Sequence, residues 1–118
     1  MEESNKLRKW QREEVVVLVT EYFRTKNLSQ DEIAKSHEKV SEFLKHREEI
    51  ITGMPVADIF RNYAGICLQS GRIRCLDPET KYSGMKGTKL QKQIVQEYLD
   101  DPQRIIDEAA VIFKRYEY

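Results

Sequence analysis

Hydrophobic residues recur at three- and four-residue spacings along most of the chain, with polar residues between them, and this pattern predicts amphipathic helices. The first stretch runs from Trp10 to about Lys26. Its run of valines is also compatible with a strand, but the length of the stretch favours a helix. Glu13 and Glu14, early in the stretch, complement the positive end of a helix. We expect Trp10, at its start, to be a core anchor.

The second and third predicted helices are recognised by their end signals. Ser29, followed three residues later by a glutamate, is a capping-box pattern, and the helix it starts extends to about Thr52. The sequence Gly53-Met54-Pro55 then ends this helix or leads it into the next one. A third helix is predicted from near Val56 to Gly71, which is a natural helix stop.

The C-terminal part of the chain combines a turn-rich loop with two further helices. Asp77-Pro78 ends an element, and residues 79–89, with two glycines, predict an exposed loop. A fourth helix begins near Lys89, and Asp101 followed by Pro102 caps a fifth. We therefore predict an all-α protein of about five helices. The predicted organisation is a single compact domain over residues 1–118, with a helix-turn-helix-like core at about 10–78 and a C-terminal helical pair at about 89–116.

Cysteines and histidines are few and do not form a recognisable reactive or metal-binding pattern. Cys67 and Cys75 are not a CxxC pair, and His37 and His46 lie well upstream at a spacing that does not suit a zinc site. We expect both histidines at the surface and at least Cys67 in the core, with its thiol reduced. The sequence predicts no catalytic residue, no metal ligand and no cofactor, and hence no enzyme.

Nothing in the sequence indicates a membrane protein. The opening residues, MEESNKLRKW, lack the apolar stretch of a signal peptide, and no run approaches membrane-spanning length. We therefore expect a cytoplasmic protein without membrane contact. The oligomeric state, and whether the chain belongs to a longer protein, stay open.

Charge is unevenly distributed although the formal net charge is zero. Residues 54–92 carry seven basic and three acidic side chains, a net charge of about +4. Residues 1–53 and 93–118 have net charges of about −1 and −3 by the same count. The zero total opposes a purely electrostatic nucleic-acid binder, but the local excess is the pattern expected for contact with phosphates.

Three stretches together resemble a helical module found near the N-terminus of bacterial HNH restriction endonucleases of the McrA-like, modification-dependent type. The first is WQREEVVVLVTEYF at residues 10–23, with its tryptophan, acidic pair and aromatic end. The second is FRNYAGICLQSGRIRCLDP at residues 60–78. The third, residues 87–109, runs from a glycine and lysine through a helix to Asp-Pro and a final helix. The opening stretch is also similar to Myb/SANT-type helix-turn-helix domains.

The resemblance implies a third helix that lies in the DNA major groove and exposes polar side chains to base edges. Carried over by position, the DNA-contacting residues are Arg61, Asn62, Gln69, Arg72 and Arg74 for bases, with Lys81, Lys86 and Lys89 for phosphates. The His-Asn-His pattern of the nuclease is missing. Ser70 and Gly71 replace larger apolar residues of the module, which predicts that the third helix ends early.

Two functions are consistent with these observations. The favoured one is a DNA-binding or DNA-targeting module related to restriction-modification proteins of host defence, without catalysis of its own. The alternative is a small phage- or mobile-element-encoded regulator or inhibitor that binds a protein of a bacterial defence system. The neutral charge balance and the missing nuclease half favour this alternative.

Overall fold

In the computed structural model, which describes residues 8–118, the chain folds into five helices joined by loops. These are α1 (Arg12–Thr25), α2 (Gln30–Thr52), α3 (Tyr63–Leu76), α4 (Lys89–Asp100) and α5 (Pro102–Arg115). No strand occurs in this range, so the prediction of an all-α fold is confirmed. None of the helices in the described range is both long enough and apolar enough to span a bilayer.

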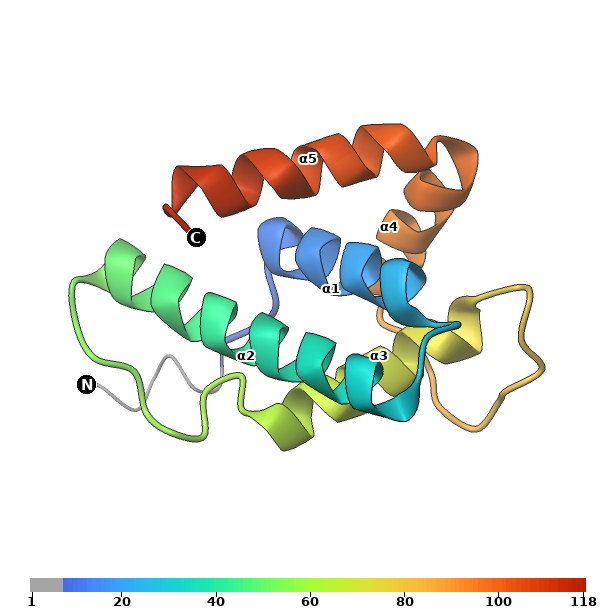
Figure 1. The fold of residues 1–118 in the computed structure, drawn as a ribbon, viewed down its shortest axis with the longest axis horizontal. Helices are drawn as coiled ribbons and strands as arrows, with labels where there is room; N and C mark the ends of the chain where they lie inside the picture. The colour runs from blue at the N-terminus through green and yellow to red at the C-terminus, as the bar shows by residue number, and fades with distance from the viewer. Residues whose placement is uncertain (1–7) are drawn as a thin grey trace.

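Helix α1 is the centre of the fold. It contacts each of the other four helices, and Figure 1 shows it between α5 on one side and α2 and α3 on the other. All residues from Val15 to Val19 are at most 2% exposed. A helix buried on all sides needs a continuous apolar run and not a single apolar stripe. This explains the valine run, which is equally typical of a buried strand.

Local capping signals define most helix ends as predicted. The Ser29 hydroxyl accepts a hydrogen bond from the backbone N–H of the third residue of α2, and Gly53 ends α2 in the left-handed conformation with φ of 70°. Asp101 caps α5, and Pro102 occupies its first turn, where a missing N–H costs nothing.

The prediction for the third helix is wrong at both ends, because α3 begins later than Val56 and continues past Gly71. Arg61 has a positive φ of 46°, which interrupts any helix that approaches from Val56. Asn62 then caps α3, accepting a hydrogen bond of 2.8 Å from the backbone N–H three residues later.

Gly71 provides space for the following loop and does not end a helix. A Cβ atom at Gly71 would lie 2.9 Å from Sδ of Met85, and a Cβ atom at Gly87 would lie 2.5 Å from Cδ1 of Leu76. Both glycines therefore allow residues 85–87 to pack directly on the second half of α3. The predicted loop is present, but it is fixed to this helix at two points.

Helices α1, α2 and α3 contact one another, as expected for a three-helix core. The connection between α2 and α3 spans residues 53–62, which is longer than the three- or four-residue turn of a helix-turn-helix motif. The three helices therefore pack together, but a longer connection stands where the helix-turn-helix prediction places a short turn.

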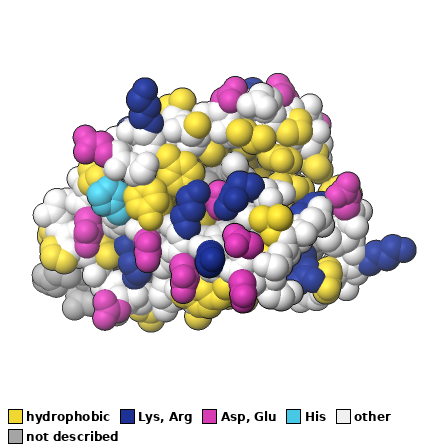
Figure 2. Space-filling view, viewed as in Figure 1, with side chains coloured by type: hydrophobic (Ala, Val, Ile, Leu, Met, Phe, Trp, Pro, Cys, Tyr) yellow, Lys and Arg dark blue, Asp and Glu magenta, His cyan; other side chains and the backbone are white. Residues whose placement is uncertain are grey.

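Aromatic side chains fill the space between α2 and α5. The ring of Tyr118 lies 5.0 Å from that of Phe43 and 6.0 Å from that of Phe113. The backbone carbonyl of Tyr116 lies 2.9 Å from Nε2 of His46. Figure 2 shows hydrophobic side chains gathered between these helices, above a band of mixed charges over α2. The C-terminal tail therefore packs back on α2 and α5.

Candidate nucleic-acid interface and neighbouring groove

Arg61 does not lie on the surface where the predicted DNA contact would need it. Its side chain is 6% exposed, and Nε donates a hydrogen bond of 2.8 Å to Oε2 of Glu14, which is fully buried. The guanidinium also lies over the rings of Trp10 and Phe60, at 4.6 and 4.5 Å from their centroids. The expectation of an exposed base-reading arginine is therefore wrong, because this charge compensates a buried carboxylate.

The carboxylate of Glu14 is the centre of this buried network. It accepts hydrogen bonds from Arg61 and Arg8 and from the backbone N–H of Gln11. Burial raises the pKa of Glu14, but the hydrogen bonds from Arg61 and Arg8 outweigh burial and leave the pKa below its usual value. The network joins α1 to the segment before α3.

Two further predicted base contacts have partners inside the protein. Asn62 uses its side-chain oxygen to cap α3. The side-chain oxygen of Gln69 accepts a hydrogen bond of 2.7 Å from Nε2 of Gln91, which is buried on α4. Both side chains therefore hold elements together in this structure.

The structure brings Arg72 and Lys86 together through the packed loop. Nη1 of Arg72 donates a hydrogen bond to the backbone carbonyl of Lys86. At this contact Lys86 is exposed and Arg72 is half-buried. Figure 2 shows Lys and Arg side chains that project at the edge of the molecule where Figure 1 places this loop.

The remaining predicted residues are exposed. Arg74 stacks on the ring of Tyr82, with its guanidinium carbon 3.4 Å from the ring centroid. Lys81, Lys86 and Lys89 are exposed. In the part of the chain that the structure describes, none of these four side chains forms an ion pair, and the same holds for Arg72 and Lys92.

This lack of acidic partners distinguishes the segment 72–92 from most of the protein. Ion pairs occupy most other described cations, namely Arg8, Arg12, Arg24, Lys26, Lys35, Lys39, Arg47, Arg61, Arg104 and Arg115. Lys9, Lys45 and Lys114 are the exceptions. The two acidic side chains of the segment, Asp77 and Glu79, both bind Lys26. The positive charge of the segment is therefore not neutralised from within.

The exposed face of α3 is apolar near its beginning. Tyr63 and Leu68 are 44% and 48% exposed, and Ile59, just before the helix, is 60% exposed. In the second half of the helix, residues 85–87 pack on Gly71 and Leu76. This face does not offer the row of polar side chains that the resemblance implies for reading bases.

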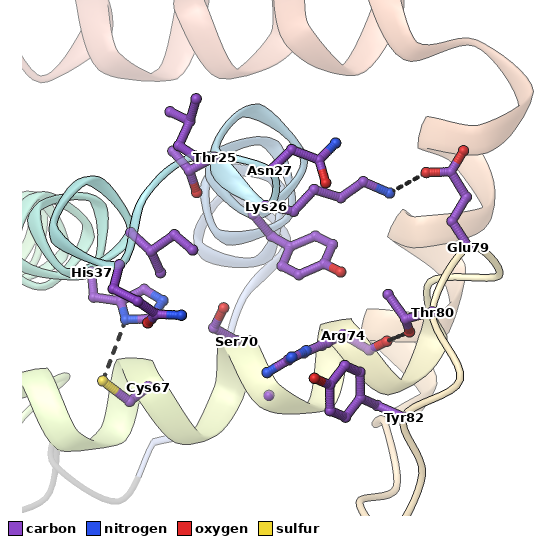
Figure 3. Close-up of a pocket in the computed structure, with 15 residues that line it drawn as sticks. Thr25, Lys26, Asn27, His37, Cys67, Ser70, Arg74, Glu79, Thr80 and Tyr82 are labelled. Carbon is purple, nitrogen blue, oxygen red and sulfur yellow. Dashed lines mark hydrogen bonds and ion pairs between the residues drawn. The ribbon is translucent and has the colours of Figure 1, made fainter.

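A groove of about 490 Å³ lies next to the charged segment. The end of α1, the first half of α2, one side of α3 and the start of the following loop form its walls (Figure 3). Asp77 holds these walls together, because its buried carboxylate accepts hydrogen bonds of 2.8 Å from the Tyr22 hydroxyl and from Nζ of Lys26. The guanidinium of Arg74 points into the groove (Figure 3).

The groove also contains a contact that the sequence gives no reason to expect. Sγ of Cys67 on α3 lies 3.3 Å from Nδ1 of His37 on α2. Both side chains are half-buried, so neither the surface position predicted for His37 nor the core position predicted for Cys67 is right. Residues so far apart in the chain meet only through the packing of α2 on α3, and no local motif marks them.

No family model matches this sequence, and no curated protein or solved structure matches it either.

Proposed function

We propose that this chain is a DNA-binding module, without catalysis of its own, that contacts the phosphate backbone through the cations of residues 72–92. One observation carries the proposal. Every Lys and Arg side chain in this stretch lacks an acidic partner among the described residues, whereas ion pairs occupy most other cations.

The physical reason is that an unpaired cation can replace the counterions condensed on DNA, whereas a paired one must first lose its carboxylate. A local cluster of this kind creates a positive potential even on a protein of zero net charge, within a Debye length of about 10 Å at 0.1 M salt. The loop contact between Arg72 and Lys86 supports the cluster, because it holds two of the cations at one place.

The resemblance to the helical module of HNH restriction endonucleases supports DNA as the partner. The positions of the side chains favour contact with phosphates over contact with bases. Phosphate contacts position a protein on a duplex but carry no sequence information. With Arg61 buried and the open face of α3 apolar, we expect binding with little sequence preference from this face.

The test is the affinity for a fluorescent DNA duplex, measured by anisotropy at about 50 mM salt. Lys86→Glu/Lys89→Glu reverses two of the unpaired charges and should weaken binding at least about tenfold. The matched control is Lys9→Glu/Lys114→Glu, which makes the same charge change at two exposed, unpaired lysines elsewhere. Equal weakening by both pairs would indicate a net-charge effect and would contradict the proposed face.

The alternative, a protein-binding regulator, is favoured by the exposed side chains of Ile59, Tyr63 and Leu68. Several large apolar side chains exposed within one short stretch of the chain are a feature of protein interfaces. The variant Ile59→Ser/Leu68→Ser distinguishes the two functions, because it leaves the cations of residues 72–92 in place. An unchanged DNA affinity of this variant supports the DNA-binding proposal. If the wild-type protein has no DNA affinity at low salt, only the protein-binding function is left.

A further inference from the structure

The thiol of Cys67 and the imidazole of His37 face each other across the groove between α2 and α3 (Figure 3), at 3.3 Å from Sγ to Nδ1. This distance places the imidazole nitrogen where it can accept the thiol proton. Both groups line the groove, so a small molecule can approach the sulfur. Neither side chain is used by the proposed DNA contact.

The imidazole of His37 is in the form that can accept the thiol proton. Burial lowers the pKa of His37, so the ring is neutral at neutral pH and has a free lone pair. The ring of Tyr63 packs edge-on near the imidazole of His37, with the two ring centroids 6.1 Å apart. A neutral imidazole within hydrogen-bond distance can act as the general base when the thiol attacks.

The second element of the site is the guanidinium of Arg74. It follows Cys67 by two helical turns, so both side chains lie on the same side of α3. Stacking on Tyr82 holds the guanidinium in place. No acidic side chain of residues 8–118 forms an ion pair with it, and a guanidinium of this kind binds a carboxylate through two parallel hydrogen bonds.

The geometry points to a thiol-modification site in this groove, at which Cys67 undergoes exchange with a small disulfide that carries carboxylate groups. In the reaction, His37 takes the thiol proton and the Cys67 thiolate attacks one sulfur of the disulfide. The old S–S bond breaks as the new one forms, and the released thiolate takes the proton back from His37. Cys67 is thereby oxidised to a mixed disulfide and half of the reagent is reduced to a thiol. Arg74 binds the carboxylate of the attached half.

Cys75 provides an internal comparison. It lies on the same helix, is also a free thiol and is also half-buried. Among the described residues, no imidazole forms a hydrogen bond with its sulfur. If exposure alone controlled reactivity, the two thiols would react at similar rates.

The experiment measures the rate of thiol modification in two single-cysteine variants. Cys75→Ser leaves only Cys67, and Cys67→Ser leaves only Cys75. With dithiobis(nitrobenzoate), an aromatic disulfide with a carboxylate on each ring, Cys67 should react about tenfold faster than Cys75. In denaturant the two rates should become equal, because the difference arises from the fold. Equal rates in the folded proteins would overturn the proposal.

Two substitutions in the Cys75→Ser background test the roles of the neighbours. His37→Gln should slow the reaction with any disulfide. Arg74→Gln should slow the reaction with dithiobis(nitrobenzoate) but not with dithiodipyridine, which carries no carboxylate. Equal slowing of both reagents would overturn the role of Arg74. If a serine variant does not fold, peptide mapping of the wild-type protein after brief labelling gives the same comparison, and labelling of Cys75 before Cys67 would contradict the site.

Discussion

Replacing Arg61 by methionine tests whether this side chain stabilises the fold, as the structure indicates, or contacts DNA, as its position in the sequence predicts. The substitution keeps an unbranched chain of similar length between Trp10 and Phe60 but removes the charge. It leaves the carboxylate of Glu14, which is fully buried, with Arg8 as its single charged partner among the described residues.

The magnitude follows from the contacts that are lost. Removing one partner of a buried ion pair costs about 3–5 kcal/mol, because the other charge stays buried. Arg8 still binds Glu14, with Nη1 to Oε1 at 3.0 Å, which places the cost at the lower end of this range. The two ring contacts of the guanidinium add about 0.5–1 kcal/mol each, partly offset by the packing of the methionine. We expect a loss of about 3 kcal/mol.

The assay is urea unfolding at neutral pH, followed by far-ultraviolet circular dichroism and by the fluorescence of Trp10. Arg74→Met is the control, because this arginine also stacks on an aromatic ring but has no acidic partner, and it should cost less than about 1 kcal/mol. A cycle with Glu14→Gln should give a coupling energy of about 2 kcal/mol between the two sites. The reasoning is refuted if Arg61→Met costs no more than Arg74→Met.

Two further predictions concern loop packing and acid stability. Gly87→Ala should cost about 1–3 kcal/mol, because a methyl group there would meet three atoms of the Leu76 side chain at 2.5–3.1 Å. Gly71→Ala should be nearly neutral, since the flexible side chain of Met85 can move away. Thermal unfolding compares the stabilities of the Gly87→Ala and Gly71→Ala variants. Equal losses of stability would contradict this packing. Hydrogen bonds from Arg12 and Gln93 lower the pKa of Glu97 to about 2, from the ordinary glutamate value of 4.5. The pKa of Glu97 is lower in the folded state than in the unfolded chain, so ionised Glu97 stabilises the fold. This contribution is fully present above about pH 4.5 and is lost as the pH falls toward 2. Glu97→Gln should flatten the fall of the melting temperature in that window, and an unchanged fall would show that Glu97 does not contribute.

Local signals predicted much of the fold because helix ends depend on neighbouring residues. The N-caps Ser29 and Asp101 and the left-handed Gly53 act within one turn of the chain, so their effects can be read from the sequence. The end of the third helix could not be predicted in this way. Gly71 is an ordinary stop signal, and only the tertiary structure shows that the helix continues past it, with Met85 packed against this glycine.

The candidate site shows the same division between local and long-range information. The excess of positive charge at residues 54–92 is visible in composition, but which cations stay unpaired depends on the tertiary structure. Arg61 and Arg74 both belong to residues 54–92. Arg61 compensates the buried charge of Glu14, whereas Arg74 stacks on Tyr82 and has no acidic partner among the described residues. Likewise, the contact between His37 and Cys67 exists only because α2 packs on α3.

The proposed DNA contact is tested most directly by the salt dependence of binding. The logarithm of the association constant should fall linearly with the logarithm of salt concentration, with a slope of about −0.9 for each phosphate contacted, or roughly −5 if all six cations of residues 72–92 contact phosphates. Lys86→Gln/Lys89→Gln should reduce the size of this slope by about 2, whereas Lys9→Gln/Lys114→Gln should leave it unchanged. An identical slope for the wild-type protein and the Lys86→Gln/Lys89→Gln variant would contradict the account.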